Sequence, residues 1–154
     1  MQQVTREELQ NHVGKAAQPT DWFTVTQEQI NQFADCTLDH QFIHVDPEKA
    51  KETPFGSTIA HGFLSLSMLS YFAETFGTTI AGAYMGVNYG FDKVRFIAPV
   101  KVNSNIRATA TLVGAVEKKP GQFMLTTEVV VEIEGSDKPA LKAQWLTMQM
   151  VKSD

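Results

Sequence analysis

The sequence predicts an α+β protein in which an antiparallel sheet wraps around one long buried helix. Helical patterns fill the first half of the chain, and the stretch 59–76 is apolar and nearly uncharged. After Gly86 the pattern changes to the two-residue alternation of strands. Helices followed by a run of strands are typical of α+β folds.

The first elements are predicted to be short. Thr5–Glu8 (TREE) has the form of a capping box, with Val4 and Leu9 placed for a hydrophobic staple. A short helix should follow and end at about Gly14. Residues 22–25 then favour a short strand.

A second capping box precedes the next helix, TQEQINQFAD. Thr26 can accept hydrogen bonds from the free amides at the helix start, and the side chain of Gln29 can reach back. Further on, Asp46 is a suitable N-cap and Pro47 suits the first helical position, so DPEK predicts another short helix. The loop between these two helices shows no helical pattern.

The longest predicted helix is Ile59–Phe76, in which Glu74 is the only charge. A helix that is apolar nearly all round should be buried. Its small residues permit close approach by another backbone or by a ligand; they are Gly62, Ser65, Ser67, Ser70 and Ala73.

About four strands should follow, joined by hairpin-like turns. The first lies around 87–96. In 106–116 the apolar or small residues of one face, Gly114 and Val116 included, alternate with polar ones, and 123–133 alternates likewise after a Pro-Gly turn. The last strand is LKAQWLTMQMV. Because such a sheet has edges and an uncovered side, we expect a homodimer.

Length and composition narrow the possible functions. A chain of 154 residues with 43% hydrophobic residues fits a single domain over 1–154. The net charge of −4 is spread out, so no nucleic-acid partner is expected. No apolar run approaches the ~20 residues that cross a bilayer, and the start does not resemble a signal peptide. With Cys36 as the single cysteine, we expect a cytoplasmic protein without a membrane partner.

Three of the four histidines and two aspartates lie within residues 39–61. The stretch begins as LDHQFIHVDPEKA, Leu38–Ala50. A solvated loop would be the simplest interpretation. Phe42 and Ile43 lie in the same loop, however, and indicate partial burial, where an Asp or His side chain needs a partner.

A metal site and an acid–base pair are the two functional interpretations. Asp and His are metal-ligand types, but HExxH, CxxC and helical facial-triad spacings are missing, so we expect no metal and no cofactor. Asp39 and His44 lie close enough along one loop to point at a single position. A carboxylate and an imidazole that share a water can exchange protons with a substrate near neutral pH.

Such a pair still needs a group that stabilises an oxyanion. The predicted helix offers unpaired N-terminal amides and a positive dipole end, and Gly62 lets a substrate carbonyl approach closely. Ser70 lies two turns further along, on roughly the same side. His61 sits beside Gly62; a structural hydrogen bond is its expected role, and we count it among the candidate site residues. These parts suit the addition of water to a double bond conjugated to a carbonyl, and its reverse.

At these residues the sequence resembles the MaoC-like dehydratases, a family that includes the (R)-specific enoyl-CoA hydratases. The resemblance rests on the Asp39-x4-His44 motif, on HVDPEKA and PFGSTIAHGF, and on the spacing from Asp39 to Gly62 and Ser70. The later NYGFDKVRFIAPV is also similar to the first long strand of the family. Most of the chain from about Asp21 onward is covered.

The hydratase motif differs from this chain at three places. It usually carries Gly before the Asp and Asn-Pro between Asp and His, where this chain has Leu38, Gln41 and Phe42. The form DHQxIHVDPE is more similar to a related branch that includes nodulation-type proteins.

The resemblance implies a hotdog fold, in which a curved antiparallel sheet wraps a long central helix. It also implies a homodimer with a CoA thioester in a tunnel near the subunit interface. Asp39 and His44 would hold and activate the water, the Gly62 amide would form the oxyanion hole, and Ser70 would support the site. The product would be an (R)-3-hydroxyacyl-CoA.

Two other functions stay open within this fold. In a thioesterase, a carboxylate directs water at the thioester carbonyl rather than at the double bond. A non-enzymatic protein would hold an acyl-CoA or an acyl carrier protein without turnover. Which of Asp39 and His44 takes the water proton also stays open.

Overall fold

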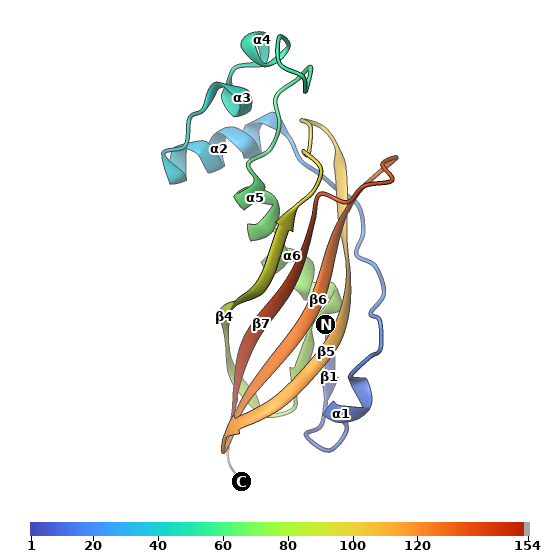
Figure 1. Cartoon of the computed structure of the whole chain (residues 1–154). Coiled ribbons are helices and arrows are strands. Elements are labelled where there is room, and N and C mark those ends of the chain that lie inside the picture. The colour runs from blue at the N-terminus through green and yellow to red at the C-terminus, as the bar shows by residue number, and fades with distance from the viewer. Residues whose placement is uncertain (153–154) are drawn as a thin grey trace.

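The computed structural model describes residues 1–152 and consists of a curled sheet with helices packed on it. The main sheet has five antiparallel strands in the order β2-β5-β6-β7-β4 (Figure 1). These strands are β2 (Phe23–Thr24), β4 (Ala83–Phe96), β5 (Asn105–Lys119), β6 (Gln122–Ile133) and β7 (Leu141–Val151). The predicted α+β class and the antiparallel sheet are confirmed.

Six helices and a second small sheet complete the described chain. The helices are α1 (Leu9–His12), α2 (Gln27–Thr37), α3 (Phe42–Val45), α4 (Pro47–Ala50), α5 (Gly62–Ser67) and α6 (Leu69–Phe76). Strands β1 (Gln2–Val4) and β3 (Thr78–Ile80) pair in parallel, which the sequence did not predict. In Figure 1, α6 lies behind the sheet, while α2, α3 and α4 gather beyond one end of it.

The predicted capping residues are found at the helix starts. The Glu8 amide donates to the Thr5 hydroxyl, and the Thr5 amide donates to the Glu8 carboxylate, as a capping box requires. Asp46 caps α4 by accepting from the Lys49 amide. The turn of α3 precedes α4 directly, so the expected absence of helix in this loop was wrong.

The start of α2 departs from the prediction in one side chain. Thr26 caps the helix by accepting from the Gln29 amide, as expected. The Gln29 side chain does not reach back; its Nε2 donates to Met68 Sδ at 3.6 Å. Met68 lies between α5 and α6, so this side chain turns inward to the central helices instead of outward to solvent.

The predicted central helix begins later and is less buried than expected. Residues 59–60 are bonded to the opposite backbone at 100–101, and the helix starts only at Gly62. One face packs on the sheet through Leu64, Leu69, Phe72 and Phe76. The other face is open in the single chain, where Phe63 is 67% and Tyr71 is 53% exposed. The prediction of burial all round was wrong because the sheet curls around one side only.

The alternation of β6 holds along the strand, whereas that of β5 is interrupted. Leu112 pairs with Thr127 and Gly114 with Thr126, so Val113 is an extra residue in a β-bulge. Beyond the bulge Ala115 is buried and Val116 is exposed. The predicted inward orientation of Val116 was wrong, because one inserted residue moves the following side chains to the other face.

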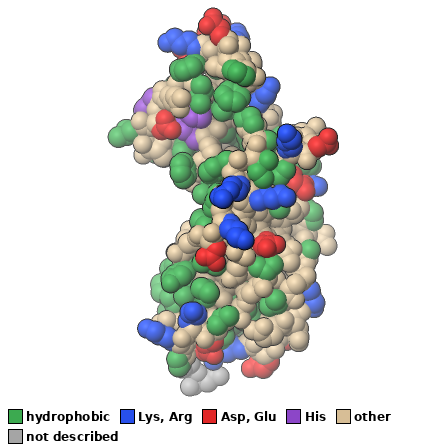
Figure 2. All heavy atoms as spheres, viewed as in Figure 1, with side chains coloured by type: hydrophobic (Ala, Val, Ile, Leu, Met, Phe, Trp, Pro, Cys, Tyr) green, Lys and Arg blue, Asp and Glu red, His purple; other side chains and the backbone are tan. Residues whose placement is uncertain are grey.

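Strand β4 is the edge of the main sheet and is bonded only to β7 within it. Nearly all of its residues are exposed, on both faces of the strand. The large apolar side chains exposed there are Tyr84, Met85, Val87, Tyr89, Phe91 and Phe96. Hydrophobic side chains lie along the same edge in the space-filling view (Figure 2). Within residues 1–152, no helix is long and apolar enough to span a membrane.

Candidate active site

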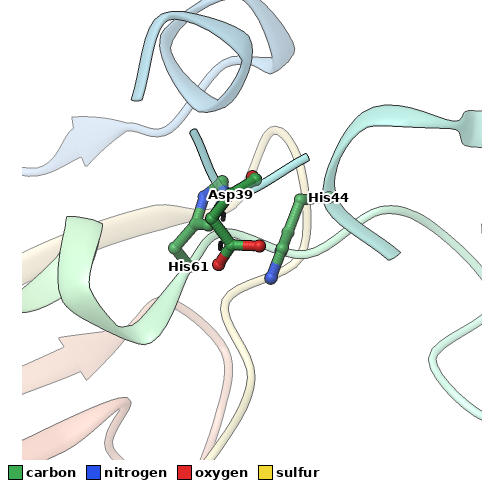
Figure 3. A group of neighbouring side chains, drawn as sticks. All are labelled: Asp39, His44 and His61. Atoms are coloured by element: carbon green, nitrogen blue, oxygen red, sulfur yellow. Dashed lines mark hydrogen bonds and ion pairs between the residues drawn. The ribbon is translucent and has the colours of Figure 1, made fainter. Parts of the chain in front are cut away.

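Asp39, His44 and His61 converge at the end of the sheet that carries α2, α3 and α5 (Figure 3). Asp39 follows α2, His44 lies on α3, and His61 directly precedes α5. One nitrogen or oxygen atom from each side chain lies within 4.8 Å of the others. The structure therefore brings together the two residues predicted to form the acid–base pair.

The end of α2 sets the direction of Asp39. Leu38 ends this helix in the left-handed conformation, with φ of 63°. This region favours glycine, the residue that the hydratase motif usually carries at this place. Asp39 Oδ1 then accepts from the Gln41 amide at 3.3 Å, and the carboxylate remains about half exposed to solvent.

His44 is buried and has one nitrogen free for chemistry. Its Nδ1 lies 2.7 Å from the backbone oxygen of Ile59. A carbonyl oxygen only accepts, so Nδ1 carries the proton and Nε2 presents a lone pair. Burial lowers the pKa of His44 and His61 adds to this, while the Ile59 carbonyl and Asp39 act in the opposite direction. His44 is thus a neutral base near pH 7.

A glutamine that the sequence analysis missed fixes the backbone of His44. Gln27 Nε2 donates to the His44 carbonyl at 2.7 Å, and Gln27 Oε1 accepts from the buried hydroxyl of Thr58. Gln27 lies in the first turn of α2, where a polar residue is usually solvated, so no sequence pattern predicts this role. The contact joins three separate segments around the imidazole.

His61 lies against both members of the pair. Its Nε2 is 2.9 Å from the backbone oxygen of Asp39, as expected for a structural hydrogen bond. Its ring stacks on that of His44, with centroids 3.8 Å apart and planes inclined by 24°. The side chain is almost completely buried.

Gly62 shares a cavity with His44. The cavity has a volume of about 320 Å³, and its walls include Phe55, Ser65, Phe96 and Pro99. As the first residue of α5, Gly62 has an amide without an intrahelical acceptor. A Cβ at this position would lie 3.1 Å from the Phe96 ring, so a side chain here would crowd the cavity.

Ser70 does not line this cavity. It lines a larger one, of about 510 Å³, between α6 and strands β4 and β7. Further lining residues are Ala73, Val87, Asn88, Thr127, Trp145 and Thr147. The structure thus places Gly62 and Ser70 on one pair of helices but in two different cavities.

The side chains of Asp39, His44 and His61 are of metal-ligand types, but their arrangement fits a tetrahedral zinc ion poorly. Tetrahedral zinc with bonds of about 2.0–2.1 Å needs ligand atoms only about 3.4 Å apart. Nε2 of His61 is already occupied by a backbone oxygen. The two imidazole planes are close to parallel, so their in-plane lone pairs do not meet at one point.

Comparison with solved structures identifies the fold. The chain matches the MaoC-like dehydratase from Rhodospirillum rubrum with a TM-score of 0.78 and 17% identity, covering 98% of this chain and 99% of that one. It matches an (R)-hydratase from A. caviae with a TM-score of 0.71 and 21% identity, covering 86% and 95%. At these identities the likeness shows the fold alone. The chain is a hotdog-fold protein, as the resemblance implied.

The family follows from sequence comparison. The model described as MaoC like domain matches residues 8–134, so the chain belongs to the MaoC-like dehydratase family. It is 49% identical over 131 residues to 3-hydroxyacyl-thioester dehydratase Z of Mycobacterium tuberculosis, covering 85% of this chain and 86% of the relative. Nodulation protein N of Rhizobium leguminosarum bv. viciae is 44% identical over 149 residues, covering 96% and 92%.

A third relative carries the hydratase name. It is the (R)-specific enoyl-CoA hydratase of Rhodospirillum rubrum, 36% identical over 115 residues, covering 73% of this chain and 76% of the relative. The predicted resemblance to MaoC-like dehydratases and to the nodulation-type branch is confirmed, and the chain is an enzyme of the hydro-lyase class.

Proposed function

We propose that the protein is an (R)-specific enoyl-CoA hydratase. It would add water to a trans-2-enoyl-CoA to give an (R)-3-hydroxyacyl-CoA, and catalyse the reverse dehydration. One observation carries the proposal: His44, with its free Nε2, lines the same cavity as Gly62, and the Asp39 carboxylate lies beside it. The (R)-specific hydratase among the relatives supports the stereochemistry.

In the proposed mechanism one water sits between the Asp39 carboxylate and His44 Nε2. The water oxygen bonds to C3 of the enoyl group while one of its protons passes to the pair. The pair delivers one proton to C2, so that H and OH are added and the pair returns to its starting state. A neutral His44 can accept a proton, and the pKa-lowering effect of its burial keeps it ready to do so.

The thioester oxygen becomes negative as C3 is attacked. We propose that the Gly62 amide donates to this oxygen, because the amide has no intrahelical acceptor and lies at the cavity that His44 lines. Ser70 is proposed to keep a supporting role from the α6 wall of the larger cavity. That cavity would receive the acyl chain, and the volume of about 510 Å³ suits a ligand group of moderate size.

A homodimer and a cytoplasmic location belong to the same proposal. The unpaired edge and exposed apolar side chains of β4 support the dimer, since such an edge is normally covered. Light scattering of the purified protein should therefore give twice the mass of the chain.

A single exposed cysteine, Cys36, supports a reducing compartment. The carrier of the acyl group is proposed to be CoA, and residues 1–154 to be one domain.

Dehydration of the two separate 3-hydroxybutyryl-CoA enantiomers tests the function and its stereochemistry together. Appearance of the conjugated enoyl absorbance is followed with purified enzyme. We expect the absorbance to rise with the (R) enantiomer only. A rise with the (S) enantiomer would contradict the stereochemical assignment, and no rise with either would contradict the hydratase proposal for short chains; longer acyl chains are then tried in the same way.

A further inference from the structure

The side chain of His61 has no part in the chemistry proposed above, although it is buried in the site. It is the N-cap residue of α5 but makes no capping hydrogen bond. Polar N-cap side chains usually accept from the helix amides, and a buried polar side chain needs some partner. The ring of His61 instead points to the loop that carries Asp39.

The first contact of His61 holds the backbone of Asp39. A carbonyl oxygen only accepts, so the bond to Asp39 O requires a proton on His61 Nε2. This bond joins residues 22 positions apart. The other side-chain hydrogen bonds that the described residues make in this loop are local, from the Gln41 amide to Asp39 and between His40 and Asp35.

The second contact fixes the plane of the His44 ring. The hydrogen bond from Nδ1 to Ile59 sets the direction of this ring but leaves rotation about that direction. The ring of His61 stacks on the His44 ring, with centroids 3.8 Å apart, and this stacking prevents the rotation. Phe33 in turn packs against His61, with ring centroids 5.0 Å apart. One buried ring therefore contacts both members of the catalytic pair.

The remaining nitrogen of His61 argues against a direct role in proton transfer. Nδ1 is buried and has no hydrogen-bond partner among the described residues. A proton there would be a buried donor without an acceptor, stacked on a second imidazole. His61 and His44 thus hold opposite tautomers, with the proton on Nε2 in one and on Nδ1 in the other.

We propose that His61 is a positioning residue that sets the separation of Asp39 and His44, through its hydrogen bond to one and its stacking on the other. The inference rests on the proposed hydratase function. Correct placement of reacting groups is worth large factors in rate, and displacement by about 1 Å can cost about 100-fold. Loss of His61 should therefore lower kcat and leave KM nearly unchanged.

Two substitutions separate the contacts. His61→Gln keeps an amide donor near the place of Nε2 but removes the ring, whereas His61→Phe keeps a ring and removes the donor. We expect kcat to fall less than about tenfold in H61Q and about 100-fold in H61F, with KM within about threefold of wild type. His40→Gln and His40→Phe are matched controls, because His40 is exposed and pairs with Asp35 outside the cavity.

The outcomes separate positioning from the alternatives. Equal kcat in H61F and wild type, with only the melting temperature lowered, would show a merely structural residue. A kcat of H61F that equals or exceeds that of H61Q, or the loss of one limb of the pH profile in both variants, would also overturn the proposal. If the wild type hydrates no enoyl-CoA, both the proposed function and this inference are contradicted. If the wild type is active, the variants test the inference alone.

A measurement on the unmodified protein keeps the proposal testable if a variant does not fold. Long-range ¹H–¹⁵N NMR of the imidazoles distinguishes the two neutral tautomers. We expect the Nε2–H form for His61 and the Nδ1–H form for His44, with partly exposed His12 and exposed His40 as references. The same tautomer in both buried rings, or an exchanging mixture at His61, would overturn the assignment.

Discussion

Strands β5, β6 and β7 are joined by long ladders of backbone hydrogen bonds, whereas residues 38–62 are held by isolated bonds, among them side-chain bonds to the backbone oxygens of Asp39, His44 and Ile59. The sheet buries a regular row of apolar side chains. The site segment consists of single helical turns joined by loops. Stability should therefore reside in the sheet and activity in the segment, and single substitutions can test whether the two separate.

The largest effect is expected from the acid–base pair. Asp39→Asn removes the carboxylate charge, and His44→Asn keeps a donor for the Ile59 carbonyl while removing Nε2. Each should lower kcat for enoyl-CoA hydration about 1,000-fold, because acid–base groups typically contribute about 10²–10⁴. Asp35→Asn is the control for charge, since Asp35 is exposed and pairs with His40. Full activity in D39N would remove Asp39 from the mechanism.

Gly62→Ala should have the next largest effect. Its Cβ would lie 3.1 Å from the Phe96 ring and would crowd the cavity at the proposed oxyanion amide. We expect kcat to fall about 100-fold, the usual loss when one oxyanion donor is disturbed. Gly114→Ala is the matched control, because a Cβ there meets only ordinary contacts at 3.5 Å. A G62A variant as active as G114A would place the oxyanion hole elsewhere.

A substitution in the sheet should show the opposite pattern. Val129→Ala on β6 removes two methyl groups from the core, where Val129 is 1% exposed. The free energy of unfolding should fall by about 2 kcal/mol, with kcat of the folded enzyme unchanged. Val116→Ala, beyond the bulge of β5, should change the free energy of unfolding by less than about 0.5 kcal/mol, because Val116 is exposed. Chemical denaturation and initial rates measure the two quantities; a fall in kcat for V129A would show that sheet and site are coupled.

The smallest predicted effect concerns pH. Burial lowers the pKa of His44 in the folded state below its usual value of 6.5. Below pH 6.5 the unfolded chain therefore binds a proton that the folded chain does not, and stability falls as pH decreases until the folded-state pKa is passed. H44N should reduce this dependence between pH 7 and pH 5. Identical pH profiles of the unfolding free energy for wild type and H44N would contradict the assigned burial effect.

The same contrast explains how much the sequence could predict. The apolar positions of 123–133 repeat every second residue, and this period identified β6 without any tertiary information. Spacing and the MaoC-like motif likewise identified Asp39, His44 and Gly62 as candidates. The bulge at Val113 was not predicted, because one extra residue leaves the surrounding composition unchanged.

Other features depend on contacts between distant segments. Gln27 contacts both His44 and Thr58, and the bond between His61 and Asp39 spans 22 residues, so neither leaves a local pattern in the sequence. The strands β1 and β3 have only three residues each, too few to show a period. The exposed face of the central helix follows from the curvature of the sheet, which composition does not encode.

Wild-type enzyme with trans-2-butenoyl-CoA distinguishes hydration from thioester hydrolysis when enoyl absorbance and free thiol are measured in the same reaction. Hydration at the His44 and Gly62 cavity predicts that the absorbance falls to an equilibrium level while no thiol appears. Release of thiol at the rate of substrate loss would contradict the account, because the water would then attack the thioester carbonyl rather than C3.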